Sequence, residues 1–151
     1  MAALVVGRDP AGSLAQSLRD DPAIGVFRKL VWQVRAGMIV DNLTYTCRLL
    51  MLARGDDFLR GLFDDYFAHE TPELFGNAES AAFAEYLAGR EIDEPYLADI
   101  LAFERAAMQV NLDGERRVIY SRHDPSVVMS ELSEGRVPVG LTEEDLEVVV
   151  G

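Results

Sequence analysis

The segment Pro95–Met108 constrains the fold of this chain more than any other. Its apolar residues recur at the spacing of one helix face, and Pro95 suits the first turn of a helix, where its missing N–H costs nothing. Glu104 falls inside that apolar stripe. Because an unpaired buried charge is very costly, we expect a structural ion pair with Arg35 or Arg48 rather than a functional acid. The sequence therefore predicts a central helix.

Helical patterns separated by short breaks precede this segment. Residues 24–54 are almost wholly helical in pattern, with a break expected at Gly37 or Asn42. Four or five helices within about ninety residues, joined by short loops, are typical of a compact α-helical bundle. The other expected boundaries are a stop at Gly55, an N-cap at Asp56 or Asp57, a stop before Pro72, an N-cap at Asn77 or Ser80, and a stop at Gly89.

The character of the chain changes after Asn111. Residues 117–121 and 146–150 are rich in β-branched side chains, which favours two strands. Between them, Asp124 and Pro125 have the N-cap and first-turn residue types of a short helix that ends near Gly135. A competing interpretation has Thr142 and Asp145 cap a last helical turn instead of the second strand.

The predicted fold class is therefore mainly α, with an N-terminal helical bundle and a small C-terminal α+β region. The expected organisation is a lead-in segment over residues 1–23, the bundle over 24–111, and the α+β region over 112–151. Two strands alone are marginal in water, so the C-terminal region needs the bundle, a third strand or a partner to be stable.

The charge of the chain limits its partners. Its formal net charge is -12 over 151 residues, which argues against binding to the phosphate backbone of nucleic acid and is compatible with a basic protein or peptide. Arg116, Arg117 and Arg122 nevertheless make a local basic cluster in the sequence. No run approaches the length of a membrane span, and the first residues lack a signal-peptide pattern. We expect a cytoplasmic protein with no membrane partner.

Few residues suggest chemistry. Asp65 and His69 share a helix face and permit a metal pair, although a surface hydrogen bond near a helix end is the simpler interpretation. Cys47, the only cysteine, is either a nucleophile activated by Arg48 or, as we favour, a buried inert thiol. His123 is expected in a turn. With no catalytic or metal motif in the sequence, we expect no catalytic residue, no metal ligand and no cofactor in this chain.

Four segments in the same order carry a family resemblance. They are Val34–Ile39 (VRAGMI), Asp57–Tyr66 (DFLRGLFDDY), Phe83–Leu87 (FAEYL) and Pro95–Glu104 (PYLADILAFE). Together they resemble the N-terminal domain of the HvfC/BufC family, once labelled as DNA-binding proteins. The likeness covers about residues 26–111, and the closing Pro-Tyr-Leu-x-Asp-x-x-x-x-Glu pattern is its most specific part. This chain departs from larger members in its short C-terminal region.

The resemblance implies a non-catalytic partner subunit in the biosynthesis of ribosomally made, post-translationally modified peptides (RiPPs). Family members associate with a TIM-barrel, multinuclear iron oxygenase that modifies a cysteine of a precursor peptide, and the 3-thiaglutamate type is the most similar. Iron is then expected in the partner enzyme, and the leader of the precursor peptide is the expected ligand of this chain.

We expect the leader to bind the C-terminal strands as an added strand. The candidate peptide-binding residues are Arg117, Val118, Ile119, Tyr120 and Ser121, followed by Leu146, Val148 and Val150. The first alternative function is a DNA-binding transcriptional regulator. A small enzyme using Glu104 and Asp99 is disfavoured, because residues five apart on a helix point about 140° away from each other.

Overall fold

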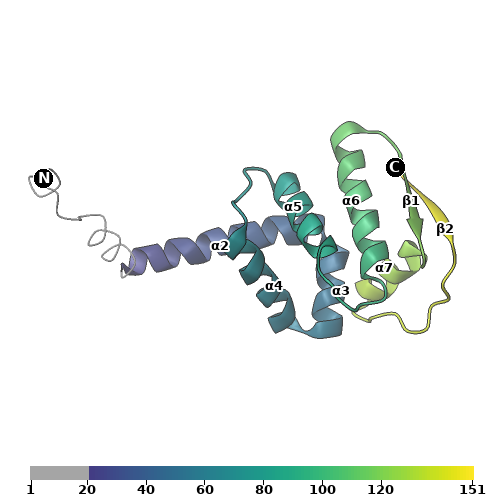
Figure 1. The fold of residues 1–151 in the computed structure, drawn as a ribbon, viewed down its shortest axis with the longest axis horizontal. Coiled ribbons are helices and arrows are strands. Elements are labelled where there is room, and N and C mark those ends of the chain that lie inside the picture. The colour runs from purple at the N-terminus through teal and green to yellow at the C-terminus, as the bar shows by residue number, and fades with distance from the viewer. Residues whose placement is uncertain (1–20) are drawn as a thin grey trace, which may run out of the picture. The chain divides into compact units, whose positions relative to one another are not determined.

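The computed structural model describes residues 21–151, and these residues are mainly helical (Figure 1). They form six helices and one two-stranded antiparallel sheet. The structure divides into two units, with the boundary between Val34 and Arg35. The expected lead-in segment falls largely outside the described residues. The elements are α2 (Pro22–Asn42), α3 (Thr44–Arg54), α4 (Asp56–His69), α5 (Gly76–Ala88), α6 (Leu97–Asp113), β1 (Arg117–Ser121), α7 (Pro125–Ser133) and β2 (Leu146–Val150).

The break expected in the long N-terminal helix lies at Asn42, not at Gly37. The Asn42 amide donates to the Met38 carbonyl at 3.0 Å, and the Thr44 hydroxyl donates to the Val40 carbonyl at 2.9 Å. Such side-chain bonds to the preceding turn compete with the regular backbone ladder. Leu43 then separates α2 from α3.

Glu104 has different partners from the arginines that we expected. Its carboxylate accepts the backbone N–H groups of Tyr45 at 2.7 Å and Thr46 at 2.9 Å. These are two of the N–H groups that the first turn of α3 leaves without an intrahelical partner, and the N-cap residue Leu43 has no side-chain acceptor. Glu104 on α6 therefore caps the start of α3. The prediction that Glu104 forms an ion pair with Arg35 or Arg48 was wrong.

Arg35 instead joins α2 to α5. Its guanidinium forms a buried ion pair with Glu79 at 2.7 Å and lies 4.3 Å over the ring of Phe67. Glu79 also accepts the backbone N–H of Glu73 at 2.7 Å, so both carboxylate oxygens have partners. A buried pair of this kind is tolerated because its remaining hydrogen-bonding groups are satisfied.

The core between α4 and α5 is aromatic. The rings of Phe63 and Tyr66 each lie 5.1 Å from that of Phe83, and Tyr86 lies 5.3 Å from Tyr66. Pairs at this separation add stability beyond the apolar area that they bury. These ring contacts follow from the aromatic residues that recur at helical spacing in the α4 and α5 segments of the sequence.

Three helix starts differ from those expected. The helix α4 begins at Asp56 after a Gly55 N-cap, so the two aspartates lie in its first turn, where they favourably meet the helix dipole. The helix α5 begins at Gly76 with Phe75 as N-cap, without a capping side chain from Asn77 or Ser80. Pro95 lies in the turn before the Tyr96 N-cap of α6.

The C-terminal elements agree with the sequence-based bounds. Both strands span the expected residues, and the Asp124 side chain accepts the Ser126 N–H to cap α7, with Pro125 in its first turn. Residues 142–145 contain no helical turn, so the competing interpretation was wrong. The sheet and α7 pack on α6 (Figure 1). The two strands are therefore stabilised by the bundle, as their small size requires.

Candidate functional site

The outer face of the β1–β2 sheet is an exposed, partly apolar surface. The strands pair antiparallel, with Val118 opposite Val149 and Tyr120 opposite Glu147. The Tyr120 side chain is 79% exposed, and Val118 and Val149 are both more than half exposed. Val118, Tyr120, Glu147 and Val149 are called the outer sheet face below. Alternation of side chains along a strand places these four on one side.

The inner face is closed by packing on α6. Ser121 and Val150 are buried, and Arg117, Ile119 and Val148 are half-buried, as is Leu146. Only Val118 and Tyr120 of the eight candidate peptide-binding residues therefore present exposed side chains. The remaining six face inward.

Glu147 and Val149 belong to the outer sheet face but are not among the peptide-binding residues predicted from the sequence. Both β1 and β2 carry β-branched residues on each side, so the sequence does not indicate which side meets the core. The only signal was Glu147, whose charge favours the solvent side and so places Val149 beside it on the same face.

Among residues 21–151 each strand has one strand neighbour, so one edge of β1 has no strand partner in this part of the chain. A hollow of about 260 Å³ lies between β1 and α6. Two alanines one turn apart, Ala102 and Ala106, leave space on the α6 side. The other lining residues are Arg105, Gln109, Arg117, Val118 and Ile119. This hollow is called the β1–α6 groove below.

Ion pairs surround the β1–α6 groove. Arg117 pairs with Asp113 one helical turn earlier and lies 3.4 Å from a carboxylate oxygen of Glu115. Arg105 pairs with Glu85 of α5. The two arginines that line the groove are thus already balanced by carboxylates, so the groove is not a strongly basic site.

A second hollow, of about 540 Å³, lies where β1 ends and β2 begins. Tyr120, Ser121, Arg122, Asp145, Leu146 and Glu147 line it. Glu143 and Glu144 border the adjoining surface, so carboxylates outnumber the one arginine there. An arrangement of this charge favours a cationic side chain over an anionic one.

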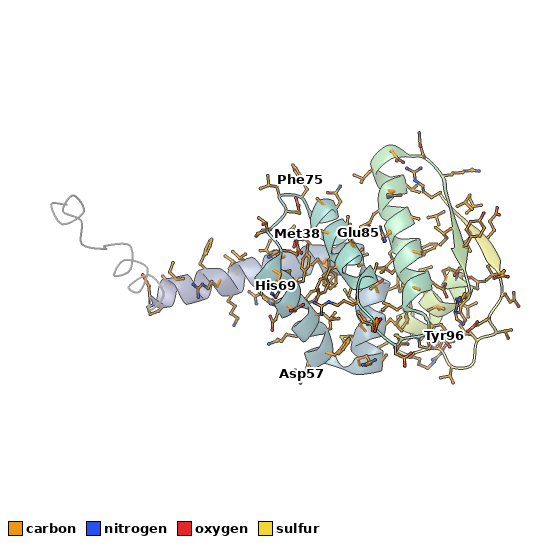
Figure 2. All side chains as sticks on the ribbon, in the orientation of Figure 1. Met38, Asp57, His69, Phe75, Glu85 and Tyr96 are labelled. Carbon is orange, nitrogen blue, oxygen red and sulfur yellow. The ribbon has the colours of Figure 1, made fainter. Side chains whose placement is uncertain are left out.

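A buried histidine–aspartate contact fixes the turn that follows β1. Asp99 of α6 accepts the backbone N–H groups of Arg122 at 2.9 Å and His123 at 3.2 Å, and Nδ1 of His123 lies 2.7 Å from the same carboxylate. The ring of Tyr96, labelled in Figure 2, meets that of His123 edge-on at 4.8 Å. Asp99 is therefore occupied in holding β1 to α6, and His123 lies in the expected turn.

The other candidate residues do not form a reactive centre. Burial raises the pKa of Cys47 to about 12, so its thiol stays protonated at neutral pH, in agreement with the inert interpretation. Nδ1 of His69 lies 2.8 Å from the Asp65 carbonyl, the simpler of the two arrangements considered. Within residues 21–151, no three His, Cys, Asp or Glu side chains gather as they would to hold a metal ion, and no helix has the length and apolarity to cross a bilayer.

No protein-family model, curated protein or solved structure matches this chain.

Proposed function

We propose that this chain is the non-catalytic recognition subunit of a RiPP biosynthetic complex in the cytoplasm. It binds the leader of the precursor peptide and docks it to a TIM-barrel, multinuclear non-haem iron oxygenase that modifies a peptide cysteine. The 3-thiaglutamate-type pathway is the most similar. The partner enzyme, in this proposal, holds the iron and performs the chemistry. The resemblance of residues 26–111 to the HvfC/BufC family supports the class of partner.

The observation that carries the peptide-binding part is the edge of β1 beside the β1–α6 groove. In an antiparallel pair, alternate residues direct their N–H and C=O groups away from the partner strand. An extended peptide placed along β1 has these groups to pair with and would convert the two-stranded sheet into a three-stranded one. Three strands with a packed face are more stable than two, so binding also stabilises the C-terminal region.

The β1–α6 groove supports β1 rather than β2 as the strand that is extended. Alternate side chains of an added strand point toward Ala102 and Ala106, where the groove has space. The other side chains point toward the outer sheet face, beside Val118 and Tyr120. Main-chain bonds would supply affinity, and these two surfaces would supply specificity.

Filling the β1–α6 groove tests this placement. Ala102 is half-buried, so Ala102→Phe places a ring in the groove without removing a core side chain. We expect the affinity for a fluorescently labelled leader peptide to fall at least about tenfold, which corresponds to about 1.4 kcal/mol. Fluorescence anisotropy titration with the precursor leader measures it.

Ala98→Phe is the matched control, because Ala98 is exposed one turn earlier on the same helix and does not line the groove. Its leader affinity should equal that of the unaltered chain. Equal affinities for the two phenylalanine variants would refute the β1 placement. No binding of the leader by the unaltered chain would refute the proposed function itself.

A further inference from the structure

The first half of α2 carries an apolar face that lies open to solvent. Val26 is 70% exposed and Phe27 is 61% exposed, and Leu30 and Val34 are also more than half exposed. All four belong to the unit of residues 1–34, in the purple part of α2 in Figure 1. Exposed apolar patches that recur along one helix mark sites of protein interaction far more than single exposed residues do.

The spacing of these residues fits a helix that binds in a groove. Phe27, Leu30, Val31 and Val34 stand at i, i+3, i+4 and i+7, the anchor positions of an amphipathic helix laid into an apolar groove. At 100° per residue, Val26 extends the same face at one border. These five residues are called the α2 face below.

Basic side chains border the α2 face on both of its sides. Arg28 lies about 60° beyond Val31 around the helix, and Lys29 lies about 60° beyond Val26 in the other direction. Both are exposed, and no aspartate or glutamate occurs between Pro22 and Val40. In a chain of net charge -12, this run of nineteen residues without a carboxylate is cationic. A complementary surface is therefore apolar at its centre and acidic at its rim.

The area of the α2 face disfavours a second copy of this chain as the occupant. A helix of thirteen residues is about 20 Å long and about 10 Å across. Two such faces packed on each other bury only a few hundred Å², well below the roughly 1,200 Å² of the smallest stable interfaces. A groove that encloses the helix on more than one side buries more surface per residue.

We infer that the α2 face docks into an apolar groove with a carboxylate rim on the iron oxygenase partner. This inference rests on the proposed function and assigns a surface of this chain to the enzyme, separate from the leader site on the sheet. Isolated helices of about this length are marginal in water, so the enzyme also stabilises the first half of α2 when it binds. The anchors are Phe27 and Leu30 at the centre of the face.

The test is co-purification and titration of the intact chain with the TIM-barrel iron oxygenase of the same genome. The double variant Phe27→Glu, Leu30→Glu places carboxylates at the centre of the face and should weaken the complex at least tenfold. Its affinity for the labelled leader peptide, measured without the enzyme, should be unchanged. Lys29→Glu should weaken the complex less and reduce its dependence on salt.

Gly25→Glu is the matched control, because Gly25 lies on the opposite side of the helix and a Cβ there would meet nothing within 4 Å beyond its chain neighbours and its own helix backbone. This variant should form the complex normally. A normal complex with the double variant would overturn the inference while leaving the proposed function intact. If the unaltered chain forms no complex with the oxygenase and binds no leader, both fail together.

Two further outcomes would assign the α2 face to another occupant and so overturn the inference. In the first, the chain alone elutes as a dimer and the double variant as a monomer, with the enzyme complex unaffected. In the second, the chain binds vesicles of phosphatidylcholine and phosphatidylserine, the double variant does not, and both bind the enzyme equally.

Discussion

Glu104 is the residue whose role differs most between sequence and structure. A carboxylate inside an apolar helix stripe was expected to meet an arginine, whereas it accepts two backbone N–H groups of α3. The two chain segments are 59 residues apart at Tyr45, so no local pattern indicates the contact. Only the absence of a capping side chain at Leu43, before Thr44, pointed to an α3 start that needs an outside acceptor.

Replacing Glu104 should destabilise the fold rather than alter a binding site. Glu104→Ala leaves the N–H groups of Tyr45 and Thr46 without their acceptor, and we expect a loss of about 1–3 kcal/mol in the free energy of unfolding. Urea denaturation followed by circular dichroism measures the loss. Glu104→Gln keeps one acceptor oxygen and should lose less. An unchanged midpoint for the alanine variant would refute the capping role.

The stability of the chain should also depend on pH through Glu104. Burial raises the pKa of this carboxyl above its ordinary value of 4.5, and the N–H bonds from Tyr45 and Thr46 offset this only in part. Because the folded pKa lies above the unfolded one, the favourable contribution is complete below about 4.5 and is lost as pH rises through the folded pKa.

Comparison with Glu104→Gln isolates this effect, because glutamine does not titrate. The difference in free energy of unfolding, unaltered chain minus variant, should decrease from pH 4 to pH 7. Groups such as Asp65 and Asp124, whose pKa values are lowered by hydrogen bonds, act equally in both proteins and cancel. A difference that increases with pH would contradict the assignment.

At the scale of elements, the bounds of the strands were predictable and their faces were not. Residues 117–121 and 146–150 are strands because β-branched and aromatic side chains fit a pleated surface. The inward side is decided by α6, which packs on β1 and β2 only in the folded chain. Because side chains alternate, correct strand bounds still leave open which face of the sheet meets the core. The residues predicted to bind the peptide therefore came from both faces.

The exposure of Tyr120 leads to a prediction about the proposed leader site. Tyr120→Lys removes an aromatic contact surface while placing an ammonium opposite Glu147, a cross-strand pair that keeps the sheet stable. Affinity for the leader peptide should fall by about three- to tenfold, and the thermal midpoint should change by no more than a few degrees. Calorimetric titration and thermal melting measure the two.

Val127→Lys provides the control for Tyr120→Lys, since Val127 is an exposed apolar residue on α7, outside the outer sheet face. It makes the same change of charge. If both lysine variants lost the same affinity, a general effect of positive charge rather than a contact at Tyr120 would explain the result.

At the scale of the whole molecule, charge favours the proposed function over the DNA-binding alternative. The net charge is -12, and five of the ten arginines of residues 35–151 form ion pairs with carboxylates. Arg35, Arg90, Arg105, Arg117 and Arg136 each form an ion pair. Neutralised arginines release few counterions from a duplex, and that release drives most non-specific DNA binding.

We therefore expect no binding of duplex DNA tighter than about 10⁻⁴ M at 150 mM salt. Anisotropy of a labelled duplex, titrated at 50, 100 and 200 mM salt, measures the affinity and its salt dependence. A dissociation constant near 10⁻⁶ M that weakens steeply with salt would favour the regulator. Arg116 and Arg122, both exposed and part of the local basic cluster, would then be the contacts to replace. Glutamine at both positions should abolish such binding, while leader affinity through the β1–α6 groove should remain.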